Sequence, residues 1–181
     1  MQQMLTSLRA RREDERGFTL IELMVVVLII AILIAIAIPT FLGAKTRAQD
    51  KAAQSSLRNA LTNAKGIYTD TDSYLTSTAA ALQLAEPSLS FKATGVASAA
   101  AKEVSVNPLS ASTELFVAMS SSGVCWVIGD NAQGPGTAFA KITGACSGTN
   151  ANTKLGVLDA TTQPAAGTNT SATADAWVAA F

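Results

Sequence analysis

The sequence predicts an α+β protein in which a long N-terminal helix packs on a small antiparallel β-sheet head. Three observations predict this fold class. No side chain from Leu23 to Ala44 is charged, a helical amphipathic pattern follows, and the second half of the chain consists of short apolar runs. The apolar half of the helix is expected to lie in a membrane or among other helices, and the amphipathic half to pack on the head.

The uncharged run is about 22 residues long, which corresponds to about 33 Å of helix and is enough to cross a bilayer core. An ordinary single-pass anchor would account for this length. Two residues do not fit a plain anchor. Glu22 places a carboxylate at the start of the run, where burial in hydrocarbon costs a few kcal/mol. Such a group suggests a partner that exists only in some other state. Pro39 is expected to kink or loosen the helix.

A charged segment with four arginines ends abruptly at Gly17, and the apolar run follows at once as GFTLIELMVVV. This stretch resembles the cleavage and assembly signature of type IV prepilins and the related pseudopilins. The resemblance implies that a prepilin peptidase cuts between Gly17 and Phe18 and methylates the new amine of Phe18. It implies that Glu22 pairs with that amine in a neighbouring subunit and that Pro39 is the helix-loosening proline. Ala31 stands where many members have glycine.

Electrostatics supports the pairing independently of the resemblance. The Phe18 amine exists only after cleavage, so the uncut chain withholds the cation that Glu22 needs. In a medium of low dielectric constant, an opposite charge a few ångströms away offsets much of the burial penalty. Subunit addition in register would then be favoured over random packing of apolar helices.

Composition excludes several classes of function. The formal net charge is zero, so direct nucleic-acid binding is not expected. The chain has no histidine, which excludes Ser-His-Asp and Cys-His nucleophiles and mixed histidine metal sites. Asp70 and Asp72 lack the glycine and the distal acidic ligand of a calcium loop, so a solvated turn is expected there. No enzyme activity, cofactor or metal is predicted.

Five segments are expected along the chain. They are a cytoplasmic leader peptide (1–17), the transmembrane and filament-core half of the helix (18–44), its amphipathic half (45–68), the globular antiparallel-sheet head (69–160) and an Ala/Thr-rich C-terminal tail (161–181). Leu57, Leu61, Ala64 and Tyr68 form the apolar stripe of the amphipathic half. A short helix is expected at 79–84, and strands are expected at 89–96, 104–106, 114–119, 124–128 and 138–142.

The two cysteines, Cys125 and Cys146, are expected to form a disulfide between neighbouring parts of the sheet. In the chain-entropy model the closed loop of about 20 residues is worth about 3 kcal/mol. The alternative is a pair of buried free thiols. A disulfide agrees with a head that faces an oxidising compartment.

The flanking charges predict the orientation in the membrane. Four arginines precede the apolar run, and the positive-inside tendency places the N-terminus in the cytoplasm. The subunit would span the cytoplasmic membrane once before assembly, and the assembled pilus would be extracellular.

The function that these observations predict is that of a structural subunit of a type IV pilus (fimbrium). Its partners would be identical subunits in a helical homopolymer, a prepilin peptidase and the inner-membrane platform for pilus assembly. Adhesion, motility and DNA uptake are all compatible with such a filament. The alternative is a pseudopilin of a type II secretion or DNA-uptake system.

Overall fold

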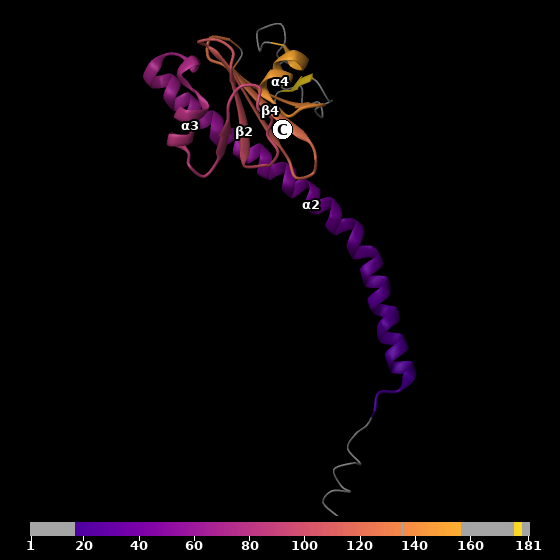
Figure 1. Ribbon diagram of the computed structural model, residues 1–181. Helices are drawn as coiled ribbons and strands as arrows, with labels where there is room; N and C mark the ends of the chain where they lie inside the picture. Colours follow the sequence, from indigo (N-terminus) through magenta and orange to yellow (C-terminus); the bar gives the residue numbers. More distant parts are fainter. Residues whose placement is uncertain (1–16, 135, 157–175, 179–181) are drawn as a thin grey trace, which may run out of the picture. The chain divides into compact units, whose positions relative to one another are not determined.

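The computed structural model of the protein describes residues 17–134, 136–156 and 176–178 (Figure 1). Residues 1–16 of the expected leader, and residues 161–175 and 179–181 of the expected tail, lie outside the described residues. The chain divides after Ala44 into two compact units, each of which is described by itself. Helix α2, Leu20–Thr71, contributes residues to both units.

The second unit contains the remaining helices and all the strands. The helices are η1 (Tyr74–Thr76), α3 (Ala79–Ala85) and α4 (Gly148–Leu155). The strands are β1 (Ser90–Lys92), β2 (Glu103–Pro108), β3 (Thr113–Met119), β4 (Cys125–Asn131), β5 (Gly136–Ile142) and β6 (Ala176–Val178). The predicted α+β class is confirmed.

The six strands form one sheet in their order along the chain, β1 to β6. All neighbouring strands from β2 to β6 are antiparallel, and hairpin turns join β2 to β3, β3 to β4 and β4 to β5. The first pair differs from the expected antiparallel arrangement, because β1 runs parallel to β2, with Phe91 opposite Val104. The connection through residues 93–102 carries the chain back along the sheet, which a parallel pair requires.

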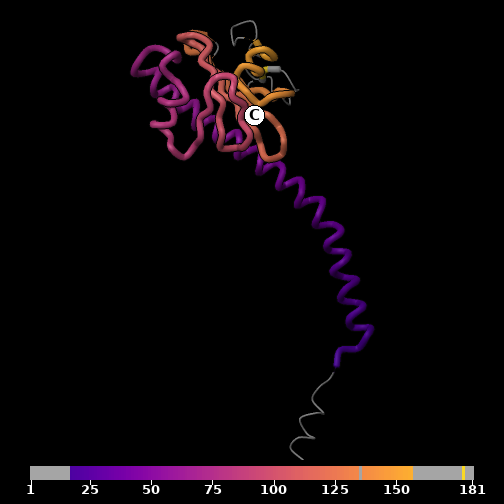
Figure 2. Tube along the Cα trace, viewed as in Figure 1, coloured from indigo at the N-terminus to yellow at the C-terminus, as the bar shows by residue number. Residues whose placement is uncertain are grey.

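The two faces of the sheet bury separate apolar clusters, as strand alternation requires. Figure 1 shows α3 and the end of α2 on one side of the strands and α4 on the other, and Figure 2 follows the same course as a tube. On the first face, the α2 residues Leu57 and Leu61 pack with Phe116 and Ile128. The stripe predicted for the amphipathic half of the helix is therefore core.

Two elements that contribute to the cluster on the second face were not predicted from the sequence. Helix α4 begins at the N-cap Ser147, whose side chain accepts from the backbone N–H of Asn150. Strand β6 lies within the segment expected to be a tail, and its Trp177 is buried and donates from Nε1 to the carbonyl oxygen of Leu155 at 3.2 Å. Gly129 makes room for this ring, because a Cβ there would come within 2.7 Å of Trp177.

Candidate processing and assembly site

The peptide bond between Gly17 and Phe18 lies in an exposed stretch without regular secondary structure. Phe18 is 85% exposed, and a Cβ added at Gly17 would meet no atom within 4 Å. Helix α2 begins only at Leu20. The backbone on both sides of this bond is thus accessible, as proteolytic cleavage requires.

Directly after this bond, Thr19 and Glu22 cap the start of helix α2. The backbone N–H of Thr19 donates to Oε2 of Glu22 at 2.9 Å, and the Thr19 hydroxyl donates to the same oxygen at 2.6 Å. In return, the N–H of Glu22 donates to Oγ1 of Thr19 at 3.2 Å. These reciprocal bonds are a capping box, in which residues three apart satisfy the unpaired N–H groups of the first turn.

Glu22 thus already has hydrogen-bond partners within its own chain, and the partner expected for it in another state stays a prediction. Its carboxylate is held by Thr19 and sits in the first turn, where the helix dipole also favours negative charge. The sequence carried a signal for this arrangement that sequence reasoning missed, because Thr-x-x-Glu just before an apolar run is the pattern of a capping box. The assembly role of Glu22 stays a prediction.

The helix after the capping box is apolar on every side. All its large hydrophobic side chains from Leu20 to Leu42 are exposed, the least exposed being Ile30 at 47%. Among the described residues, α2 is the one helix long and apolar enough to cross a membrane. An apolar surface of this extent needs a membrane or a partner to cover it.

Pro39 lies inside α2, and the helix continues through it. A proline has no N–H for the carbonyl one turn earlier, so one helical bond is missing there. Next to it, the Thr40 hydroxyl donates to the carbonyl oxygen of Ala37 at 2.9 Å and approaches that of Ile36 at 3.3 Å. Such back-bonding weakens the helical ladder locally. These two features fall where the sequence predicts a loosening role for Pro39, and that role stays a prediction.

In the second unit, Cys125 and Cys146 form a disulfide with a Cα–Cα distance of 5.5 Å. Cys125 begins β4, and Cys146 follows β5, just before the N-cap of α4. Both are buried in the cluster on the second face of the sheet. The bond fixes the loop that leads from β5 into α4.

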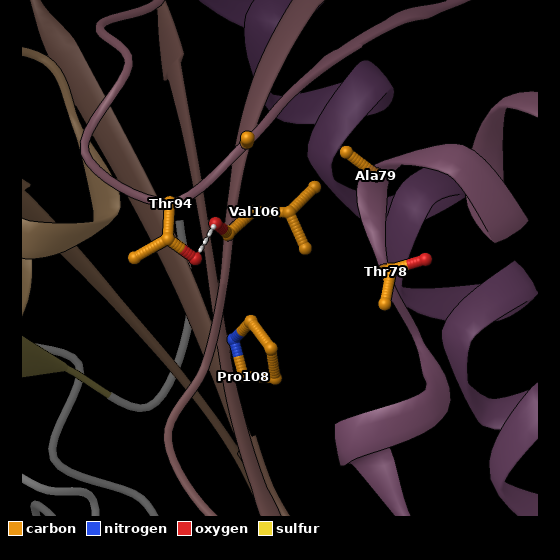
Figure 3. A pocket seen from close by; sticks show the side chains of 6 residues that line it. Thr78, Ala79, Thr94, Val106 and Pro108 are labelled. Atoms are coloured by element: carbon orange, nitrogen blue, oxygen red, sulfur yellow. Dashed lines mark hydrogen bonds between the residues drawn. The ribbon is translucent and has the colours of Figure 1, made fainter.

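Within the described part of the chain, no group of three or more His, Cys, Asp or Glu residues could hold a metal ion. A cavity of about 280 Å³ lies near the start of α3, and its walls are apolar or hydroxyl-bearing. Figure 3 draws the side chains that line it. It is lined by Thr78, Ala79, Ala93, Thr94, Val106 and Pro108. The Thr94 hydroxyl is already used, donating to the carbonyl oxygen of Val106 at 3.1 Å.

Comparison with known families identifies the N-terminal segment. Residues 13–38 match the family described as the prokaryotic N-terminal methylation motif, a stretch that contains Gly17, Phe18 and Glu22. No curated protein and no solved structure matches the chain. The motif is typical of type IV pilins and pseudopilins and implies processing by a prepilin peptidase and assembly into pilus-like polymers. The motif thus supports a type IV pilin-like or pseudopilin-like precursor.

Proposed function

We propose that this chain is the structural subunit of a type IV pilus, cleaved after Gly17, methylated on the amine of Phe18 and polymerised through α2. The observation that carries the proposal is the methylation motif over residues 13–38, followed by an apolar helix whose large side chains are all exposed. Identical helices in a filament would cover that surface after the membrane has released it.

In this proposal, Glu22 exchanges or shares its partners when a subunit joins the filament. The hydroxyl and N–H groups of Thr19 are neutral donors, whereas the amine of a neighbouring Phe18 would carry a full positive charge, and a hydrogen bond from a charged donor is the stronger kind. That amine would therefore be the better partner of the Glu22 carboxylate, and a subunit placed out of register would forgo this gain.

The proposed orientation places the N-terminus in the cytoplasm and the unit from Lys45 onward outside the cytoplasmic membrane. The disulfide between Cys125 and Cys146 supports this, because disulfides persist in oxidising compartments. The segments proposed for the polymer are the filament-core half of the helix (18–44) and the sheet head (69–160), with Pro39 allowing α2 to adjust during packing.

The direct test is to shear filaments from cells, determine the N-terminal residue of the subunit and image the polymer. A methylated Phe18 in long surface fibres is the expected result. A subunit processed in the same way but confined to the envelope, with secretion lost on deletion, would instead indicate a pseudopilin. An intact chain dispersed in the membrane as monomers would refute both assignments.

The role of Glu22 is tested by comparing Glu22→Gln with Asp70→Asn. Both remove one acidic charge, but Asp70 is an exposed residue near the end of α2, outside the motif. Glu22→Gln should lower the yield of filaments at least about tenfold, the factor that 1.4 kcal/mol represents. Asp70→Asn should leave the yield unchanged. Equal yields from both variants would refute the pairing.

A further inference from the structure

A buried polar cluster lies under α2, on the first face of the sheet, and the processing motif does not explain it. Its centre is Asp130 on β4, whose side chain is 3% exposed. The Nζ of Lys65, on α2, lies 2.8 Å from Oδ1 of Asp130. The hydroxyl of Tyr74 donates to Oδ2 at 2.7 Å, and the hydroxyl of Thr137 donates to Oδ1 at 2.5 Å. A lysine amine and a carboxylate thus meet in a site closed on one side by the sheet.

A second acid lies beside this pair. Glu114 on β3 is the direct cross-strand partner of Asp130, so both side chains stand on the same face of the sheet. Glu114 is fully buried, and neither of its carboxyl oxygens has a hydrogen-bond partner. Burial raises the pKa of Glu114 to about 9; the nearby Ser77 hydroxyl, which does not reach hydrogen-bond geometry, opposes the rise, and the charge of Asp130 adds to it. The group is a carboxylic acid at neutral pH.

An ion pair alone does not account for this arrangement. Lys65 and Asp130 compensate each other's charge without help from Glu114. A buried polar group without a partner costs about 1–3 kcal/mol, so Glu114 lowers the stability of the head. A protonated acid beside a carboxylate that is itself paired with an amine is, however, the kind of group that a condensation between the two needs for proton transfer.

We propose that Lys65 and Asp130 condense to an intramolecular amide bond, with Glu114 as the group that transfers protons. The ammonium of Lys65 first passes a proton to Oδ1 of Asp130, which gives a neutral amine and a neutral acid. The amine nitrogen attacks Cγ of Asp130. Glu114 then protonates the departing oxygen, the bond from Cγ to Oδ1 breaks, and Glu114 recovers a proton from the nitrogen. One water leaves, and no oxidant or other reactant is needed.

The remaining contacts suit this reaction. Tyr74 donates to Oδ2, which carries the negative charge in the tetrahedral intermediate, and a fixed donor at that position stabilises such a charge. Burial and the hydrogen bond to Asp130 raise the pKa of Tyr74, so its hydroxyl stays a donor. The side chain of Lys65 is 49% exposed, and the released water therefore has a path to solvent along it.

The bond would join helix α2 covalently to strand β4. The disulfide holds the other end of the same strand, at Cys125, to the loop before α4. A pull on α2 would then reach the sheet through a covalent bond rather than through packing alone. This inference concerns the head and holds whether or not the chain polymerises.

The primary test is the intact mass of the full-length chain purified in detergent. With the amide bond, the mass is lower by one water than the mass expected from the processed sequence and its disulfide. Tryptic digestion should then give a branched peptide that contains both Lys65 and Asp130, with no cleavage after Lys65. A second ion pair on the same chain joins Lys92 to Glu103 at 3.2 Å, and the two side chains are 31% and 28% exposed, so this solvated pair should give no such peptide.

Two variants separate the reaction from the ion pair. Lys65→Arg keeps the charge beside Asp130 but removes the nucleophilic amine, so it should show the full mass. Glu114→Gln keeps the shape of the buried side chain but has no proton to give, and bond formation should slow at least about 100-fold, the usual contribution of a general acid. Retained fluorescence of the buried Trp126 would show that each variant is folded.

If the wild-type chain shows no loss of water from its intact mass after prolonged incubation at neutral pH, the proposal is overturned. Lys65 and Asp130 would then form an ion pair only. If Glu114→Gln loses the water as fast as the wild-type chain does, the proposed role of Glu114 is overturned. Loss of water from Lys65→Arg would place the condensation elsewhere and would also overturn the assignment.

Discussion

Replacing Glu114 with glutamine should remove a large pH dependence from the stability of the head. The folded state keeps the proton of Glu114 up to a pKa of about 9, whereas the ordinary value is 4.5. Between these two values the folded state binds one more proton than the unfolded state. The contribution of Glu114 to stability is thus greatest below about pH 4.5 and falls by about 1.4 kcal/mol for each pH unit as the pH rises through this window. Glutamine does not ionise, and its variant lacks this slope.

Between about pH 5 and about pH 7.5, the free energy of unfolding of the protein with Glu114 should fall by about 3 kcal/mol more than that of Glu114→Gln. Glu114 is fully buried, so solvent screening does not reduce this figure much. The groups that face it are the carboxylate of Asp130, the hydroxyl of Ser77 and the phenol of Tyr74. None of these changes between the two proteins, and the difference between the stability curves therefore isolates Glu114.

The measurement is urea unfolding of the full-length chain in a nonionic detergent, followed by tryptophan fluorescence at a series of pH values. It is made in a Lys65→Arg background, in which no amide can form between residues 65 and 130. The two proteins should be similar near pH 5, and Glu114→Gln should become the more stable one as the pH rises. Parallel curves for the two proteins over this range would show that Glu114 is ionised in the folded state and would refute the reasoning.

Three further predictions follow from contacts in the two units. Thr19→Val should cost about 1 kcal/mol at the start of α2 and speed amide hydrogen exchange over residues 20–23, whereas Thr19→Ser should not; equal exchange would contradict the capping box. Replacing Cys125 and Cys146 together with serine should lower the free energy of unfolding of the head by about 3 kcal/mol, and an unchanged urea midpoint would contradict this. Gly129→Ala should destabilise the head by about 1–3 kcal/mol because its Cβ meets the Trp177 ring at 2.7 Å, while Gly66→Ala, where a Cβ meets no atom, should not.

Much of the fold follows from local patterns in the sequence. The helical spacing of Leu57, Leu61 and Ala64 predicted the face of α2 that packs on the sheet, and these residues are buried. Short apolar runs bounded by turn residues predicted β3, β4 and β5 to within a few residues, because both signals are local in the sequence. The pairing of β1 with β2 could not be predicted in this way, since a strand pattern does not state the direction of its neighbour.

Helix α4 and strand β6 were missed because tertiary contacts stabilise them. The segment from Gly148 to Leu155 has the composition of a loop, and it is helical because Ser147 caps it and Ala151 packs into the core. In β6, the buried indole of Trp177 is one of the contacts that hold the strand. At the buried cluster, Lys65, Glu114 and Asp130 are far apart in sequence, and only the pairing of β3 with β4 brings the two acids together.

The bonds between Thr19 and Glu22 have a consequence for the way the polymer could come apart. They join residues three apart in one chain, so a subunit that leaves the filament can remake them without any other molecule. In the proposed filament, the carboxylate of a released subunit would keep these local hydrogen bonds in the lipid, so returning the subunit to the bilayer would cost less free energy. The proposed filament would then be suited to reversible growth, with released subunits available for reuse.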